Sequence, residues 1–183
     1  MSATKKLLLG SVLMLTLFSF RDTHEHAFHR LFHHQPEGDV RIVVIKSNYE
    51  LQVYDKDGWY ATYPAVFGSR SLGDKMVMGD RKTPEGIYHI VSKRPHEKWN
   101  KIMDLDYPTA ADVAKFRERK AAGLIPGNAR IGNGIAIHGT WPHDDHAVDA
   151  YQMWTNGCIS LKNEDMDEVY HIAPVGTEVV IRR

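Results

Sequence analysis

The segment Thr155-Asn156-Gly157-Cys158-Ile159-Ser160-Leu161 carries the single cysteine of the chain, between a glycine and a β-branched residue. Upstream, Ile137-His138-Gly139-Thr140 places a histidine in a second glycine-bearing segment. A thiol and an imidazole are the minimum set for a cysteine nucleophile and its base. The alternative is an inert buried thiol, a common fate of a lone cysteine. The spacing alone does not bring the two residues together.

The chemistry of this pair follows from the thiol. A cysteine attacks as thiolate, so a neighbouring imidazole must take its proton or stabilise its charge. His138 is the candidate because it ends an apolar strand and precedes a glycine, where the backbone can turn sharply. The backbone N–H groups of Gly157 and Cys158 are candidates for an oxyanion hole.

The composition predicts one ordinary globular domain. The chain has 183 residues, 43% of them hydrophobic and 25% charged, with 23 basic (Lys+Arg) and 23 acidic residues. This charge balance gives no basic field for nucleic acid, so we expect no nucleic-acid partner. One cysteine excludes an internal disulfide but does not fix the compartment.

The N-terminus resembles an export signal. Lys5 and Lys6 precede an apolar run over residues 7–20, which Arg21 ends. A positive stretch followed by an apolar run of this length is typical of a secretory signal and short for a membrane span. The pattern predicts a signal peptide or an N-terminal inner-membrane anchor over residues 1–20, and a periplasmic or other envelope location. The alternative is a buried core helix.

Residues 21–38 are predicted to be a linker rich in histidine. The histidines of this tract can bind metal, but nothing orders them as ligands, and a polar spacer is the simpler interpretation. These histidines are His24, His26, His29, His33 and His34.

The folded domain is predicted to cover residues 39–183 and to be mostly β. Short alternating or β-branched runs predict strands, and Asp55-Lys56-Asp57-Gly58 predicts a hairpin turn. Two helices are expected, the second with Asn163 as its N-cap. The architecture expected is a sandwich or barrel with two or so helices. The strands are expected at 40–46, 51–54, 59–67, 86–91, 134–138 and 177–181, and the helices at 110–123 and 163–172; residues 68–81 and 141–154 are expected to be loops.

Together these segments resemble the L,D-transpeptidase (YkuD-type) catalytic domain of bacterial cell-wall enzymes. The resemblance rests on the His138-Gly139 and Thr155-x-Gly157-Cys158 pair and covers about residues 39–183. Further segments follow in the family's order: Leu51-Gln52-Val53-Tyr54, Thr83-Pro84-Glu85-Gly86-Ile87-Tyr88, Tyr107-Pro108 and Gly176-Thr177-Glu178-Val179-Val180-Ile181.

The resemblance implies a β-sandwich-like fold and cysteine acyl transfer on peptidoglycan stem peptides. Cys158 is then the nucleophile, His138 the general base and acid, and Gly157 an oxyanion-hole residue. Carbapenem-type β-lactams are the expected inhibitors, and no metal or organic cofactor is implied. The expected substrate-binding residues are Gly139, Thr140, Trp141, Thr155, Asn156, Ser160 and Tyr107.

One position departs from the family pattern. Many members carry arginine two positions after the cysteine, where this chain has Ser160. An arginine there can hold a substrate carboxylate, and serine cannot replace its charge. Hydrolysis as an L,D-carboxypeptidase, endopeptidase or amidase therefore stands beside transpeptidation, and Arg70 or Arg130 is a candidate for the missing charge. A peptidoglycan-binding scaffold without catalysis is the non-enzyme alternative.

Several polar and aromatic residues allow a structural interpretation beside a functional one. The run His143-Asp144-Asp145-His146 is either a metal site or a solvated active-site loop. The aromatic residues Trp141, Tyr151 and Trp154 line a substrate groove or pack in the core. The acidic helix 163–172 is expected to be a solvated amphipathic helix that packs through Met166, Val169 and Ile172.

Overall fold

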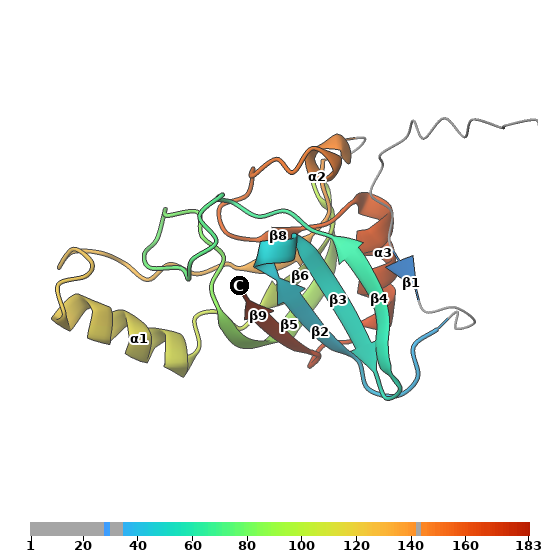
Figure 1. Cartoon of the computed structure of the whole chain (residues 1–183), viewed down its shortest axis with the longest axis horizontal. Helices are drawn as coiled ribbons and strands as arrows, with labels where there is room; N and C mark the ends of the chain where they lie inside the picture. The colour runs from blue at the N-terminus through green and yellow to red at the C-terminus, as the bar shows by residue number, and fades with distance from the viewer. Residues whose placement is uncertain (1–27, 30–34, 142–143) are drawn as a thin grey trace, which may run out of the picture.

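The computed structural model describes residues 28–29, 35–141 and 144–183 (Figure 1). The predicted signal or anchor and most of the predicted linker lie outside the described residues. Within the described part, nine strands form one hydrogen-bonded sheet in the order β1-β4-β3-β2-β9-β5-β6-β7-β8. Their bounds are β1 Phe28–His29, β2 Arg41–Ile45, β3 Glu50–Asp55, β4 Gly58–Pro64, β5 Gly86–His96, β6 Asn100–Leu105, β7 Ala136–His138, β8 Ile159–Ser160 and β9 Glu178–Arg182.

Strand β5 turns this sheet into two layers. Its first residues, 86–89, pair with β9, and its later residues pair with β6, with a register shift between Ile90 and Ser92. Such an irregularity bends a strand and increases its twist. At the far edge, Val66 and Ser160 exchange backbone hydrogen bonds of 2.9 Å, so β8 also contacts the segment that follows β4. The sheet therefore folds back on itself around a common core.

The core is built from the apolar sides of both layers and from one helix. Buried residues of β2, β3 and β9 include Ile42, Val53 and Val179, all with 0% exposure. Met166 and Val169 of α3 (Asn163–Ile172) complete the core, and α3 contacts β6. The mostly β, sandwich-like fold predicted from the sequence is confirmed.

Helices α1 and α3 lie at opposite ends of the molecule (Figure 1). Helix α1 (Ala110–Ala121) begins with a capping box between Thr109 and Asp112. The remaining helical segments are α2 (His146–Asp149) and a 3₁₀ turn, η1 (Lys46–Asn48). Among the described residues, no helix has the length and apolar character needed to cross a bilayer.

The strand and turn predictions are confirmed in most places. The hairpin joins β3 to β4 at Asp55 and Gly58, where the Asp57 N–H donates to the Asp55 carboxylate at 2.9 Å. Gly58 takes the positive φ of 107° that the turn requires. Strand β6 was not predicted, because charged residues interrupt its apolar side, and β5 continues past Val91 to His96.

Three details of the predicted helical and loop regions are wrong. The 141–154 segment contains α2 instead of being a loop throughout. Asn163 is the first residue of α3 and not its N-cap, because its side-chain oxygen accepts the Thr140 N–H at 3.1 Å instead. The acidic face of α3 is not wholly solvated, since Asp165 is only 5% exposed.

Candidate active site

Strands β7 and β8 bring the histidine and the cysteine to one pair of neighbouring strands. The two strands are parallel, with Ile137 opposite Ile159 and His138 opposite Ser160. Cys158 directly precedes β8, so the same register sets it opposite Ala136. Because alternate residues of a strand point to the same side, His138 and Cys158 share one side of this strand pair. The fold thus supplies the juxtaposition that the spacing could not.

The His138 ring is held by the backbone that follows it. Its Nδ1 lies 2.7 Å from the Gly139 carbonyl, which can only accept, so Nδ1 carries the hydrogen. Nε2 is then the basic nitrogen. The residue is 2% exposed, and burial lowers the pKa of His138 to about 4. The imidazole is therefore neutral at pH 7 and able to accept a proton.

Gly139 is needed because its peptide is enclosed. Its N–H donates to the Trp99 carbonyl at 3.1 Å, and its carbonyl accepts from His138. A Cβ at this position would lie 2.4 Å from Asn163 Oδ1 and 2.9 Å from the Trp99 carbonyl oxygen. Any larger residue would displace the peptide that orients the His138 ring.

The Cys158 thiol is half-buried and its Sγ lies 3.5 Å from the Gly134 carbonyl oxygen. Burial raises the pKa of the Cys158 thiol, while the Ala136 backbone N–H and the Lys75 ammonium favour the thiolate. At pH 7 the pair is therefore a neutral thiol beside a neutral imidazole, the protonation state that general-base catalysis starts from.

The turn before Cys158 is fixed by Thr155. The Thr155 hydroxyl accepts the Gly157 N–H at 3.2 Å and donates to the Cys158 carbonyl at 2.8 Å. Gly157 has a φ of +123°, and a Cβ there would lie 2.7 Å from the Lys82 carbonyl oxygen. The Gly157 N–H therefore must turn from Thr155 toward the substrate if it is to serve an oxyanion hole.

Arg81 fastens the same turn from a distant loop and was missed in the sequence. Its Nε donates to the Thr155 carbonyl at 3.2 Å and its Nη2 to the Met153 carbonyl at 2.8 Å. Gly68 lets the segments meet, since a Cβ there would lie 2.5 Å from the Thr155 carbonyl oxygen. No motif in the sequence linked Arg81 to the cysteine; its side chain reaches the site through the loop between β4 and β5.

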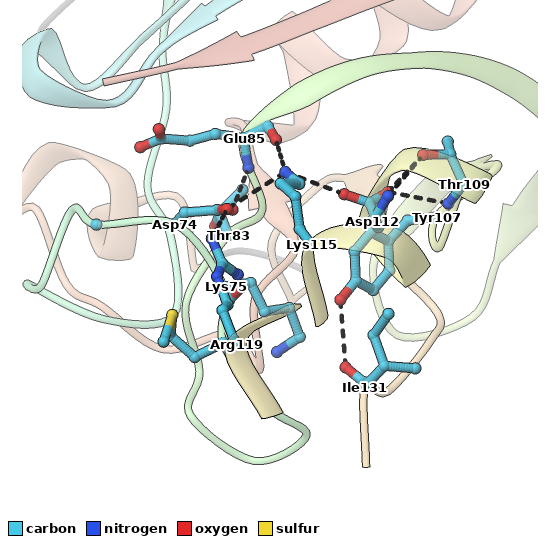
Figure 2. A network of polar contacts seen from close by, with 12 residues as sticks. Asp74, Lys75, Thr83, Glu85, Tyr107, Thr109, Asp112, Lys115, Arg119 and Ile131 are labelled. Carbon is cyan, nitrogen blue, oxygen red and sulfur yellow. Dashed lines mark hydrogen bonds and ion pairs between the residues drawn. The ribbon is translucent and has the colours of Figure 1, made fainter. Parts of the chain in front are cut away.

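That loop is anchored in turn by α1 (Figure 2). The Asp74 carboxylate accepts from Arg119 at 2.6 Å and from Lys115 at 3.3 Å, and it also accepts the Glu85 N–H at 2.8 Å. Lys115 further donates to the Glu85 carbonyl at 2.8 Å. The Asp74 carboxylate thereby ties helix α1 to the middle of the loop and to its end at Glu85.

Aromatic rings surround His138. Trp99 stacks on the imidazole with centroids 4.7 Å apart, and Trp154 meets it edge-on at 5.3 Å. Trp141, 40% exposed, packs on Trp154 at 4.0 Å. Trp99 was missed in the sequence, although a tryptophan in the polar stretch Glu97-Lys98-Trp99-Asn100 is an unusual choice for a turn and was an available signal.

The remaining predicted substrate residues differ in their access to solvent. Trp141 and Asn156 are exposed. Thr140 and Ser160 have 0% exposure, and Thr140 instead bonds Asp145 at 2.5 Å. Tyr107 is 7% exposed, and its hydroxyl donates to the Ile131 carbonyl at 3.2 Å. The buried residues can influence a substrate only through their neighbours.

Two further predictions concern charge and metal. Arg70 and Arg130 are both exposed. Lys75, which is paired with Asp80 at 2.8 Å, lowers the pKa of the Cys158 thiol, but less than burial raises it. Residues 142–143 lie outside the described residues, as does nearly all of the histidine tract. Over the described ranges, no group of three His, Cys, Asp or Glu side chains is arranged to hold a metal ion.

Comparison with known proteins gives a consistent family. A family model for the L,D-transpeptidase catalytic domain (YkuD) matches residues 39–181. A Fuscovulum blasticum protein from the ATP synthase subunits region, assigned by name to the L,D-transpeptidases, is 29% identical over 117 residues, which are 60% of this chain and 56% of that protein. YafK of Escherichia coli K12, assigned likewise, is 26% identical over 137 residues, which are 72% of this chain and 46% of YafK.

The structural comparison agrees on the fold. Pgp2 from Campylobacter jejuni, a helical cell shape determining protein, superposes with a TM-score of 0.59 at 23% identity, over 79% of this chain and 48% of Pgp2. The chain spans about half the length of the curated relatives it matches.

Proposed function

Because this chain belongs to the L,D-transpeptidase catalytic domain family, we propose that it acts on peptidoglycan stem peptides as a cysteine acyltransferase. Cys158 is the nucleophile and His138 the general base and acid. The observation that carries this proposal is the shared side of β7 and β8 on which both residues lie, with His138 Nδ1 bonded to Gly139 and Nε2 left as the base.

In the first half-reaction, the thiol proton moves to His138 Nε2 while Sγ attacks the carbonyl carbon of the third stem residue. The bond from that carbon to the nitrogen of the terminal D-alanine breaks, and the leaving amine takes the proton from the imidazolium. The stem is then a thioester on Cys158. The N–H groups of Gly157 and Cys158 are the proposed donors to the oxyanion.

In the second half-reaction, a side-chain amine of another stem attacks the thioester carbonyl. The amine gives a proton to His138, the carbon–sulfur bond breaks, and the departing sulfur takes the proton back. The product is a 3–3 cross-link. Trp141 and Asn156, which are exposed, are the proposed contacts for the stem peptides or the sugar strand.

Hydrolysis is the second candidate, and the observation that favours it is Ser160. Its side chain has 0% exposure, so this position offers no cation to an acceptor stem. Water in place of the amine would make the same site a carboxypeptidase or an endopeptidase. A peptidoglycan-binding scaffold without catalysis is the non-enzyme alternative.

The proposal also concerns location. Peptidoglycan lies outside the cytoplasmic membrane, so the domain must be exported to act on it. Residues 1–20 are the proposed signal peptide or inner-membrane anchor, and residues 21–38 the spacer between it and the catalytic domain.

Purified muropeptides separated by mass test the proposal. Transpeptidation gives cross-linked dimers, hydrolysis gives loss of D-alanine or release of a linked group, and Cys158→Ala and His138→Asn should abolish either product. A carbapenem should add its mass to Cys158 in the wild type and not in Cys158→Ala. No product from any muropeptide and no carbapenem adduct would overturn the assignment.

A further inference from the structure

The turn between β5 and β6 makes two separate contacts with the catalytic histidine segment, and both come from Trp99. Its indole stacks on the His138 ring with centroids 4.7 Å apart and planes at 24°. Its backbone carbonyl accepts the Gly139 N–H at 3.1 Å. Gly139 in turn accepts from His138 Nδ1. One residue thus constrains the face of the imidazole and the peptide that sets its tautomer.

The indole is itself held as part of a stack. His96 packs on its other face with centroids 4.4 Å apart and planes at 7°. The indole N–H is buried and has no hydrogen-bond partner among the described residues. An unpaired buried donor costs on the order of 1–3 kcal/mol, so the position of the ring needs another explanation than its own hydrogen bonding.

We propose that Trp99 is a positioning residue for the general base, holding the His138 ring flat against the β5–β6 turn so that Nε2 stays directed toward the cysteine side of β7 and β8. The ring also excludes water from one face of the imidazole and so keeps it neutral. This inference rests on the proposed function, because it assigns His138 the role of base.

The charged groups near the His138 ring are not the main cause of its lowered pKa. The titratable groups on the packed elements are His96 at the end of β5, Lys101 and Asp104 from β6, Asp145 from the loop before α2, and Cys158 beside β8. Lys101 is paired with Asp167, and Asp104 with Arg94. Burial is the main cause that lowers the pKa of His138, and His96 adds to it.

The test distinguishes the effect of the Trp99 indole ring from that of the Trp99 backbone carbonyl, which contacts Gly139. Trp99→Leu keeps apolar volume and the carbonyl but removes the stacking ring, and Trp99→Phe restores an aromatic face. Trp59→Leu, a half-exposed tryptophan on β4, is the matched control. The His138 ring proton is followed by NMR against pH, with its signal identified by its loss in His138→Asn.

In Trp99→Leu, the titration of His138 should move up from about pH 4 toward 6.5, the ordinary value for histidine, and turnover on muropeptides should fall on the order of 10–100-fold with KM little changed. Trp99→Phe should recover most of both, and Trp59→Leu should resemble the wild type. A folded Trp99→Leu with an unchanged titration would overturn the proposal. The titration needs no substrate, so it is read separately from the peptidoglycan assignment.

Discussion

Ser160 is the register partner of His138 in the parallel pair of β7 and β8, and both side chains converge on the Gly139 carbonyl. His138 Nδ1 lies 2.7 Å from that oxygen and Ser160 Oγ 3.4 Å. The residue that departs from the family pattern is therefore built into the support of the His138 ring. Its 0% exposure leaves no room for a long charged side chain.

Substitution of Ser160 tests this support. Ser160→Ala removes a long, weak hydrogen bond, so we expect a loss of a few-fold in turnover with an unchanged melting temperature. Ser160→Arg must bury a cation beside His138, at a cost of several kcal/mol, and should yield little folded protein. Ser71→Arg, at an exposed position of the loop before β5, is the control. Folded and more active Ser160→Arg protein would contradict this account.

The neutral pair predicts a specific pH dependence of the thiol. Burial raises the pKa of Cys158 and lowers the pKa of His138 to about 4. The fraction of thiolate therefore grows only at alkaline pH, above the range of an ordinary cysteine near 8.5. Alkylation by iodoacetamide, followed by mass spectrometry with glutathione as reference, should rise up to and beyond pH 9. A plateau between pH 5 and 8 would instead reveal a preformed thiolate–imidazolium pair.

Arg81 should matter for turnover more than for stability. Its two hydrogen bonds hold the Met153 and Thr155 carbonyls just before Cys158, the proposed nucleophile, while the residue itself is exposed. Arg81→Ala should lower turnover about 10–100-fold through misplacement of the turn. Lysine cannot form both contacts, so Arg81→Lys should be intermediate. Arg117→Ala, on the exposed side of α1, should be silent; equal activity of Arg81→Ala and Arg117→Ala would disprove the role.

Residues in short sequence motifs could be predicted from the sequence, and residues that the fold brings to the site from distant segments could not. Cys158 and His138 stand in short motifs, and the strands follow from alternation of apolar residues, so both were readable. Trp99 and Arg81 reach the site from the β5–β6 turn and the loop before β5, and no spacing rule connects them to the cysteine. Asn163 followed the N-cap rule in sequence, but its contact with Thr140 took precedence.

The Asp74 anchor makes a prediction about stability. Burial alone would raise the pKa of Asp74, but the Arg119 guanidinium, the Glu85 N–H and Lys115 outweigh it, so the pKa lies below its usual range. The unfolded chain then binds the proton more readily, so the stabilisation is full above about pH 4 and is lost as the pH falls through the folded value. In urea denaturation at pH 7, the free energy of unfolding of Asp74→Asn should be on the order of 2–3 kcal/mol below that of the wild type.

At pH 3 the difference between Asp74→Asn and the wild type should shrink. Glu118→Gln, an exposed carboxyl on α1, should unfold like the wild type at both pH values. A difference that stays constant from pH 7 to 3 would show that the carboxylate charge is not what anchors the loop.

Asp165 on α3 predicts the opposite pH dependence. Burial and the neighbouring Glu164 raise the pKa of Asp165 to about 7, and its Oδ2 has no hydrogen-bond partner among the described residues. Between pH 4 and 7 the folded protein holds a proton that the unfolded chain releases, so stability falls as the pH rises through this window. Asp165→Asn mimics the neutral acid. In urea denaturation at pH 8, its free energy of unfolding should exceed that of the wild type by on the order of 2–4 kcal/mol. This gain should vanish near pH 4.

Asp167, two residues along the same helix, is the matched control for this prediction. It is ion-paired with Lys101, and its pKa lies below the usual range, because hydrogen bonds from Lys101 and Asn100 outweigh the opposing effect of burial. Asp167→Asn should therefore be neutral or slightly destabilising at pH 8, since the pair is half-exposed and such pairs contribute little. If both variants raise the urea midpoint at pH 8 equally, a general relief of negative charge on α3 explains the gain. Stabilisation by Asp165→Asn alone identifies the buried carboxyl, which the helix retains at the expense of stability.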